Sequence, residues 1–500
     1  MTDQQRFDTI ASLGNELIYT PNLDRLVRRG SSFPNAYSTC PVCVPARYTI
    51  RTGCEPPRTA IFANEAPHPA PGQHQSINGR CGPYLALRMR ELGYRTFGIG
   101  KFHTSPRDED LGYDYHEHSE ELYRPGQRAT DSYARWIADV HPYYDFQEGL
   151  MGERTEMYYV PQMSHVPAEA GVEHWAAERA VEQIAHDDGR SFFGFVSFVG
   201  PHPPFAPPIP FNRMYDPDRM GTPLLGDIQT DHMDQQIPWM NRIIWAEEIN
   251  EPWFSILKAR YYGEISYIDW CIGKILDSVD ERDDADNTLI CFFSDHGEHL
   301  GDHHAWQKES FFEESCRIPF LLSWPERVAS NSECGALACL ADLFGIATGA
   351  AGDFDARDGV DLLRTLTSKS AGRNHLVGYH GRPGTRAFKM MVRRGEWKFI
   401  YLANGGMEQL FHLREDPNEL QNLASLTDVE DFRSIALHAC KAAASASTKD
   451  GELVHFPFAE FVPEDNPYGN GMSRIYQFDA SRGVSGFPKR PSDVMAFFDD

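Results

Sequence analysis

The chain has 500 residues, of which 41% are hydrophobic and 24% charged, an ordinary globular composition. It carries 47 basic and 72 acidic residues, a formal net charge of −25. Nucleic acids and anionic membranes attract basic proteins, so this balance argues against both as partners. An anionic small molecule remains compatible with the chain, but only at a locally positive site. The sequence has no apolar run of about 18 residues, so we expect no membrane-spanning helix.

Ten cysteines in 500 residues are too few for a disulfide scaffold, and their spacing does not match a structural zinc site. We therefore expect reduced thiols. Polar residues follow Met1 where a secretory leader would be apolar, and this predicts a cytoplasmic protein for the chain as given.

Strand-like apolar runs alternate with helical periodicity over the first 370 residues. The expected strands are Arg95 to Gly100, Phe192 to Phe198, Thr288 to Phe293 and Ile318 to Ser323. Helical spacing of apolar residues covers Trp175 to Ile184 and Ile265 to Leu276. Continuous apolar runs are typical of strands that are buried on both faces. The pattern predicts an α/β fold with a doubly wound, mostly parallel sheet flanked by helices.

Two long segments, 104–170 and 201–250, interrupt this alternation and contain few apolar runs. Loops of this length are usually functional or disordered, so we interpret both as excursions over one face of the sheet. Loops on a rigid scaffold commonly select the substrate. Aromatic side chains here could stack on a sugar face or pack the loops themselves; they include Tyr143, Tyr144, Trp239 and Trp245.

The character of the chain changes after about residue 370. Phe388 to Val392, a turn at Arg394-Gly395, and Trp397 to Tyr401 predict a β-hairpin. Residues 407–413 predict a further strand, and 427–445 a helix. We therefore divide the chain into a catalytic α/β domain (1–370), a smaller C-terminal α+β subdomain with a short antiparallel sheet (371–460), and a surface-wrapping tail (461–500).

Polar residues follow the predicted strands directly. Lys101 and His103 follow the first strand, His202 the second, and Asp295 with His296 the third. In open α/β sheets, ligands bind beyond the carboxyl ends of the strands. We expect these five side chains to converge on one site.

The most informative motif is Cys43-Val44-Pro45-Ala46-Arg47, followed by Thr52-Gly53. Further motifs follow in chain order: TPNLDRL (20–26), GKFH (100–103), SDHGE (294–298), GDHHAWQK (301–308), LREDPNE (413–419) and NLA (422–424). Together they resemble the sulfatases of the alkaline-phosphatase superfamily over roughly residues 1–425. Cys54 begins a second C-x-P-x-R match without the downstream Thr-Gly, so Cys43 is the candidate.

The resemblance implies a metal site and a modified cysteine. A formylglycine-generating enzyme would oxidise Cys43 to formylglycine during maturation. One divalent metal would then be held by Asp3, Gln4, modified Cys43, Asp295 and His296. Oxygen-rich ligands favour Ca²⁺, while the imidazole of His296 also admits Mn²⁺ or Zn²⁺.

The resemblance also implies the remaining catalytic roles. Arg47 and Lys101 would orient the formylglycine and the sulfate, and His103 would assist elimination. His202 and Lys308 would bind sulfate oxygens and protonate the leaving group. A hydrated aldehyde suits this reaction, because one hydroxyl attacks sulfur and the other then expels sulfate, which splits one hard step into two easier ones.

The implied activity is that of a sulfatase, a sulfuric ester hydrolase that cleaves a sulfate monoester, and we expect a sulfated carbohydrate as substrate. Two alternatives stay open: a phosphonate monoester or phosphodiester hydrolase of the same superfamily, and a catalytically silent metal-binding relative in which Cys43 is never oxidised.

One feature departs from the family pattern. The family's first strand precedes the metal-binding aspartate, whereas only Met1 and Thr2 precede Asp3. We expect an upstream segment that forms this strand. The alternative is an Asp3 that is loosely held at a frayed chain end.

Overall fold

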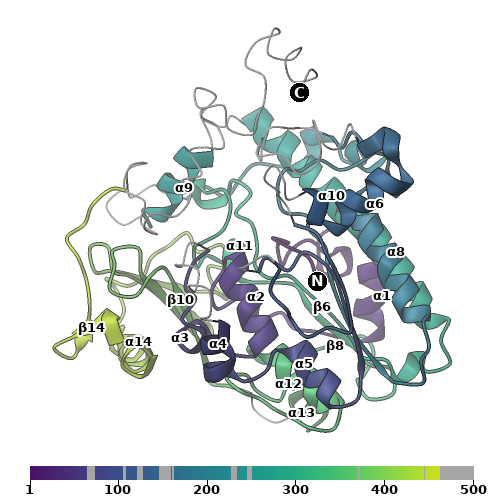
Figure 1. Ribbon diagram of the computed structural model, residues 1–500. Helices are drawn as coiled ribbons and strands as arrows, with labels where there is room; N and C mark the ends of the chain where they lie inside the picture. The colour runs from purple at the N-terminus through teal and green to yellow at the C-terminus, as the bar shows by residue number, and fades with distance from the viewer. Residues whose placement is uncertain are drawn as a thin grey trace.

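The computed structural model shows a sheet with helices on both faces and a second, antiparallel sheet beside it (Figure 1). It describes residues 1–64, 74–104, 108–120, 128–145, 159, 161, 163–226, 234–244, 251–368, 372–443 and 445–461. The elements before residue 200 are α1 (Pro21–Arg29), β1 (Ser31–Ser32), β2 (Ala36–Tyr37), α2 (Cys43–Thr52), α3 (Pro56–Thr59), α4 (His74–Cys81), α5 (Leu85–Glu91), β3 (Arg95–Gly100), β4 (Tyr115–His118), α6 (Ser132–Val140), α8 (Val172–Ala185) and β5 (Phe192–Ser197).

Later elements complete the core and build the C-terminal part. They are α9 (Gln236–Ile244), α10 (Glu251–Asp280), β6 (Ile290–Phe293), α11 (Glu313–Cys316), β7 (Phe320–Ser323), β8 (Ser332–Glu333), β9 (Ala338–Cys339), α12 (Asp342–Ala350), α13 (Leu362–Ser368), β10 (His375–His380), β11 (Lys389–Arg394), β12 (Trp397–Leu402), β13 (Met407–His412), α14 (Glu430–Ala443), β14 (Thr448–Lys449) and β15 (Glu452–Leu453).

The N-terminal residues join two groups of strands into one sheet. Strands β4-β3-β5 are parallel, and β6-β7-β1-β8 form the second group. The carbonyl of Met1 accepts the N–H of Phe198, just after β5, at 3.0 Å. The N–H of Thr2 donates to the carbonyl of Phe293, at the end of β6, at 3.0 Å, and Thr2 bridges Ser294 in parallel. The sheet therefore runs from β4 through residues 1–2 to β8.

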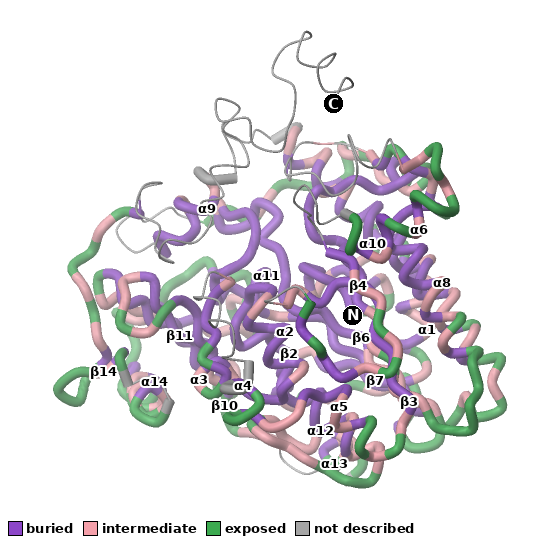
Figure 2. Tube along the Cα trace, in the orientation of Figure 1, coloured by how far each residue is buried: buried purple, intermediate pink, exposed green. Residues whose placement is uncertain are grey.

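Alternate residues of the central strands enter different cores. Phe292 and Leu321 pack with α1, α8 and α10, whereas Phe293 and Leu322 pack with α2 and α12. Figure 2 shows the central strands buried between these layers. The apolar runs were continuous because both faces are covered, which confirms the predicted α/β class. The expected strand at Ile318 to Ser323 is β7, which runs antiparallel to β6, so the sheet is mixed.

The long segment 104–170 is not wholly a loop, and this part of the expectation is wrong. It supplies β4, which pairs in parallel with β3, and α6, whose N-cap Asp131 accepts the N–H of Ala134. The two long segments are only partly described, and Trp245 lies outside the described residues. Trp239 is 3% exposed and packs in a core cluster, so it does not offer a stacking face.

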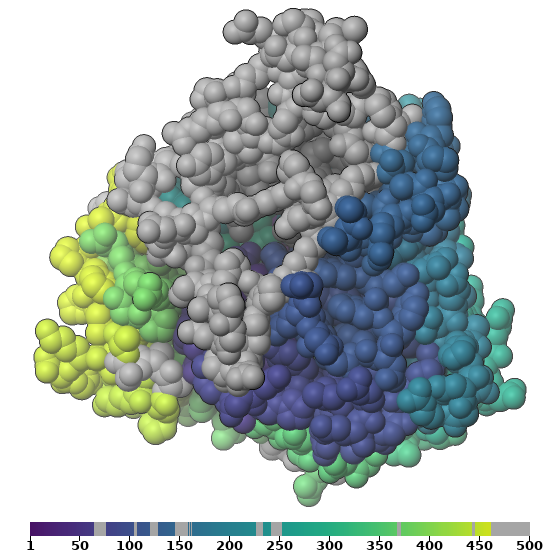
Figure 3. Space-filling view, viewed as in Figure 1, coloured from purple at the N-terminus to yellow at the C-terminus, as the bar shows by residue number. Residues whose placement is uncertain are grey.

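The C-terminal part matches the predicted elements. β11 and β12 pair with Arg394 opposite Trp397, which confirms the hairpin, and β13 and α14 lie where a strand and a helix were expected. β10 completes the four-stranded antiparallel sheet, which was not foreseen. Figure 3 shows this C-terminal part in green to yellow, on the opposite side of the viewed face from the segment that carries α6. The division at residue 370 stays a prediction, and the tail lies outside the described residues beyond 461.

Among the described helices, including the 30-residue α10, none is both long enough and apolar enough to cross a bilayer.

Candidate active site

Asp3 is fixed at the carboxyl edge of the sheet, between β5 and β6. Its N–H donates to the carbonyl of Gly200 at 3.1 Å, and its side chain is 0% exposed. On one side of Asp3, Thr2 bonds to Phe293 at the end of β6, and on the other side the N–H of Gln4 donates to Oδ1 of Asp295. The alternative of an Asp3 held loosely at a frayed end is therefore wrong.

Helix α2 presents Cys43 and Arg47 to the same site. Cys43 is its first residue, and Arg47 lies four positions later on the same face. The Thr52-Gly53 pair ends the helix: Gly53 has φ 66° and donates its N–H to the carbonyl of Thr49 at 2.8 Å. Glycine adopts this left-handed conformation without strain. Cys54 lies beyond this cap, outside the helix that presents Cys43 and Arg47, which favours Cys43 as the candidate.

Four side chains gather donor atoms in a buried cluster that could hold a metal ion. One atom from each of Asp3, Cys43, Asp295 and His296 lies within 4.8 Å of the others. The Sγ of Cys43 is 3.2 Å from Nε2 of His296 and 3.8 Å from Oδ1 of Asp3. Two carboxylates, an imidazole and the position that formylglycine would occupy form a donor set that fits a divalent cation.

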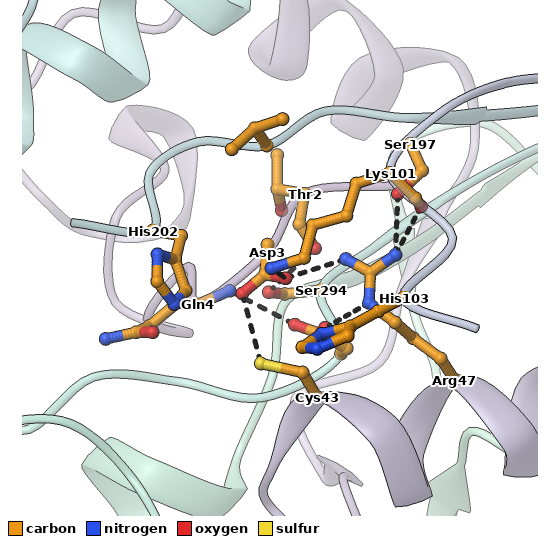
Figure 4. A network of polar contacts seen from close by, with 12 residues as sticks. Thr2, Asp3, Gln4, Cys43, Arg47, Lys101, His103, Ser197, His202 and Ser294 are labelled. Atoms are coloured by element: carbon orange, nitrogen blue, oxygen red, sulfur yellow. Dashed lines mark hydrogen bonds and ion pairs between the residues drawn. The ribbon is translucent and has the colours of Figure 1, made fainter. Parts of the chain in front are cut away.

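Two buried cations flank this cluster (Figure 4). Arg47 donates through Nη2 to Asp3 at 2.7 Å and through Nε to Asp295 at 3.1 Å, and the Nζ of Lys101 lies 2.7 Å from Oδ2 of Asp3. Burial raises the pKa of Asp3, but Lys101 and Arg47 outweigh it and hold the pKa well below its usual range. Burial together with Asp3 raises the pKa of Asp295 to about 6.

The thiol of Cys43 lies in the same electrostatic field. Burial and Asp3 raise its pKa, but Lys308, Lys101 and His296 outweigh them, so the pKa is well below the ordinary value. Burial lowers the pKa of His296, while Asp295 and Cys43 raise it more. The site thus stabilises negative charge at position 43.

Gln4 and Lys308 contact each other beside this cluster. The Nζ of Lys308 donates to Oε1 of Gln4 at 2.6 Å, and the Nε2 of Gln4 donates to Glu298. Gln4 also anchors the ligand loop, because its N–H donates to Oδ1 of Asp295 at 3.1 Å. Its role as a metal ligand stays a prediction.

His202 is buried, and its proton can be placed. Its Nδ1 lies 2.7 Å from the carbonyl of Pro203, which only accepts, so Nδ1 carries the proton and Nε2 the lone pair when the ring is neutral. Burial, then Lys308 and Lys101, holds the pKa of His202 well below its usual value. A neutral His202 carries no proton on Nε2 to give, so Lys308 is the better candidate for protonating a leaving group.

His103 enters the site in an unusual backbone conformation. Its φ is 50°, and its N–H donates to Oε1 of Glu120 at 2.7 Å. His118 contacts the same carboxylate through Nε2. Glu120 therefore fixes the backbone that carries His103.

Three buried glutamates support the site, and the sequence motifs predicted a role for none of them. They are Glu120, Glu173 and Glu298. Glu173 accepts the N–H groups of Val199 and Gly200 at 3.2 and 2.7 Å, and the carbonyl of Gly200 in turn holds Asp3. Of the three, only Glu298 lies in a recognised motif, SDHGE, so the sequence offered an indication of a functional role for Glu298 alone.

The family model for sulfatases matches residues 1–344. The chain is 27% identical over 457 residues to an arylsulfatase from Clostridium perfringens, a match that covers 86% of this chain and 90% of the relative. It is 29% identical over 433 residues to a choline-sulfatase from Rhizobium meliloti, covering 82% and 78%. A solved phosphonate monoester hydrolase from Agrobacterium radiobacter superposes with a TM-score of 0.72 at 22% identity, covering 91% of this chain and 98% of that one.

The family model and these relatives place the protein among the hydrolases of the alkaline-phosphatase superfamily, and its fold agrees with that class. Within that class, the chain belongs to the sulfatase family.

Proposed function

We propose that this chain hydrolyses a sulfate monoester, with formylglycine derived from Cys43 as nucleophile and one divalent metal bound by Asp3, Gln4, Asp295 and His296. The observation that carries the proposal is the meeting of Cys43, at the start of α2, with three further metal-binding donors within 4.8 Å. Family membership supports the same activity.

The charge of each side chain determines the catalytic role that we propose for it. When bound, a divalent cation neutralises the nonbridging oxygens of the ester, and the hydrated aldehyde at position 43 supplies the attacking hydroxyl. Lys101 and Lys308 bind the anionic ester, and Arg47 keeps Asp3 and Asp295 ionised and oriented. Lys308 donates the proton to the leaving alkoxide, and His103 assists the elimination step.

The oxidation of Cys43 must precede folding. Cys43 is 1% exposed, and the neighbouring Val42 and Ala46 are also buried. A formylglycine-generating enzyme would therefore act on the unfolded segment. Mass spectrometry of the peptide that spans Cys43 tests this step, because formylglycine is about 18 Da lighter than cysteine. An unmodified cysteine in all of the protein would leave the silent metal-binding relative as the better description.

A phosphonate monoester or phosphodiester hydrolase is the second candidate, favoured by the structural match to such an enzyme. Sulfate and phosphonate esters have similar shapes and differ in charge. Turnover of matched aryl sulfate and aryl phosphonate esters by the same preparation decides between them: faster hydrolysis of the sulfate supports the proposal, and faster hydrolysis of the phosphonate refutes it.

We propose a sulfated carbohydrate as the physiological substrate and Ca²⁺ as the metal. The two relatives named above are called after an aryl and a choline ester, so the alcohol varies within the family. Parallel assays with sulfated sugars and choline sulfate, each with Ca²⁺ or Mn²⁺ added to chelator-treated protein, test both choices.

A further inference from the structure

Glu298 is a buried carboxylate whose hydrogen-bonding capacity is fully used. Its Oε1 accepts the N–H groups of Leu300 at 2.9 Å and Gln307 at 2.7 Å. Its Oε2 accepts the hydroxyl of Tyr159 at 2.7 Å and the amide group of Gln4. A carboxylate offers about four acceptor positions, and all four are filled by donors. Segments far apart in the sequence therefore meet at one side chain that is 0% exposed.

The two neighbours of the Gln4 amide admit only one of its orientations. An ionised carboxylate such as Glu298 only accepts hydrogen bonds, and an ammonium such as Lys308 only donates them. The amide satisfies both when its NH₂ group faces Glu298 and its oxygen faces Lys308, as the structure has it. The reverse orientation would leave a donor facing a donor and an acceptor facing an acceptor.

Backbone conformation gives a second, independent reason to regard Glu298 as a support. Gln4 has φ 68° and Gln307 has φ 69°, values that non-glycine residues rarely adopt. Such conformations persist where surrounding contacts hold them. Glu298 contacts both residues: it accepts the side-chain amide of Gln4 and the backbone N–H of Gln307. Because Gln307 directly precedes Lys308, the second contact also fixes the backbone next to Lys308.

We propose that Glu298 is a positioning residue that selects the orientation of the Gln4 amide, so that its carbonyl oxygen faces Lys308 and is available as a ligand. The inference rests on the proposed function, because it takes Gln4 to be one of the metal ligands. It goes beyond that function by assigning the oxygen-ligand character of Gln4 to a residue outside the ligand set.

The variant Glu298→Gln is nearly isosteric, and it separates this role from simple packing. The N–H groups of Leu300 and Gln307 require an oxygen, so the new NH₂ group must face Gln4. The amide of Gln4 then turns its oxygen toward that donor and its NH₂ group toward Lys308. We expect a 10- to 100-fold loss of metal affinity, the usual range for residues that orient ligands.

The charge-swapped double variant, Gln4→Glu with Glu298→Gln, is the decisive test. It restores an acceptor facing a donor on both sides of position 4, so it should recover most of the lost affinity. A role in packing alone predicts that Gln4→Glu gains affinity through its added charge whether or not Glu298 is replaced, whereas the orienting role predicts a gain only in the double variant, because in Gln4→Glu alone two carboxylates face each other. Tyr159→Phe is the matched control, since it removes one hydrogen bond to the same oxygen of Glu298 without placing a donor against Gln4. It should bind metal nearly as the wild type does.

The measurement is titration of chelator-treated protein with CaCl₂ and with MnCl₂, followed by calorimetry and by melting temperature, with no ester present. Affinities in Glu298→Gln equal to those of the wild type would overturn the proposal. So would a double variant no better than Glu298→Gln, or a loss in Tyr159→Phe as large as in Glu298→Gln.

Folding and the proposed function are separated by the same experiment. If Glu298→Gln does not fold, a folded, metal-binding double variant supports the proposal, and a double variant that also fails to fold overturns it. A wild type that binds the ions but hydrolyses neither sulfate nor phosphonate esters refutes the proposed function and leaves this inference standing. A wild type that binds neither ion overturns both.

Discussion

Arg47 ties together the two carboxylates of the candidate metal site, and its replacement should have a large effect that depends on metal. The guanidinium is 2% exposed, and the Asp3 and Asp295 side chains that it contacts are 0% exposed. Arg47→Met keeps an unbranched apolar stem but removes the guanidinium and its charge. Because neither carboxylate gains water in exchange, we expect a loss of about 3–5 kcal/mol in the free energy of unfolding.

Arg47→Lys is the matched variant, because it keeps the charge but lacks the fork that reaches both carboxylates. It should lose one charge-assisted hydrogen bond, about 1.5–3 kcal/mol. A bound divalent cation neutralises the same carboxylates, and at 100 times its Kd it stabilises a protein by about 2.7 kcal/mol. The deficit of Arg47→Met should therefore shrink when Ca²⁺ is added.

The assay is denaturant and thermal unfolding of the wild type and both variants, each in chelator and in Ca²⁺. We expect the order wild type, Arg47→Lys, Arg47→Met in chelator, with the smallest spread in Ca²⁺. If Arg47→Met unfolds together with the wild type in chelator, or if its deficit is the same with and without Ca²⁺, then Arg47 does not hold the carboxylates as argued.

Four further substitutions test the nucleophile, the metal and the ligand loop. Cys43→Ala should abolish ester turnover without lowering the melting temperature, whereas Cys54→Ala should keep substantial turnover; the opposite result in a turnover assay would show that the wrong cysteine was chosen. Asp295→Ala should lose both Ca²⁺ binding and turnover, because a charged ligand has gone. Full activity of chelated wild-type protein would contradict the metal assignment. Gly297→Ala should weaken Ca²⁺ binding, because a Cβ there would lie 1.9 Å from the carbonyl oxygen of Glu314 and displace the loop. A titration that shows unchanged affinity would rule out this coupling.

Much of the fold was predictable because local patterns and tertiary structure agree. The continuous apolar run at 290–293 reports a strand covered on both faces, and the hairpin around Gly395 follows from its turn residues. The direction of β7 was not predictable, because an apolar run carries no information about parallel or antiparallel pairing. β4 was missed because Tyr115–His118 is polar and only half-buried, so it lacks an apolar run.

The site was predictable where residues follow strand ends or stand in motifs, and not where they act through the backbone. Lys101 and Asp295 meet both conditions, because each follows a predicted strand and each stands in a motif. Glu173 is a helical residue whose carboxylate holds the N–H groups of Val199 and Gly200, and a glutamate within α8 has no local feature that distinguishes it from a surface one. Only the tertiary structure brings its carboxylate to that turn.

The net charge of −25 therefore says little about the site, because the relevant charges are buried in compensating sets. Arg47, Lys101 and Lys308 are each at most 2% exposed, and each contacts a carboxylate or amide oxygen of Asp3, Asp295 or Gln4. A second set of acids, represented by Glu298 and Glu173, accepts N–H groups of the segments next to those cations and carboxylates, from Gln307 and Gly200 respectively. Burying so many ionised groups is tolerable only when each has partners. Under the proposed function, an anionic ester would add negative charge beside Lys101 and Lys308, and a cation would add positive charge beside Asp3 and Asp295, so each ligand would offset the charge of the other.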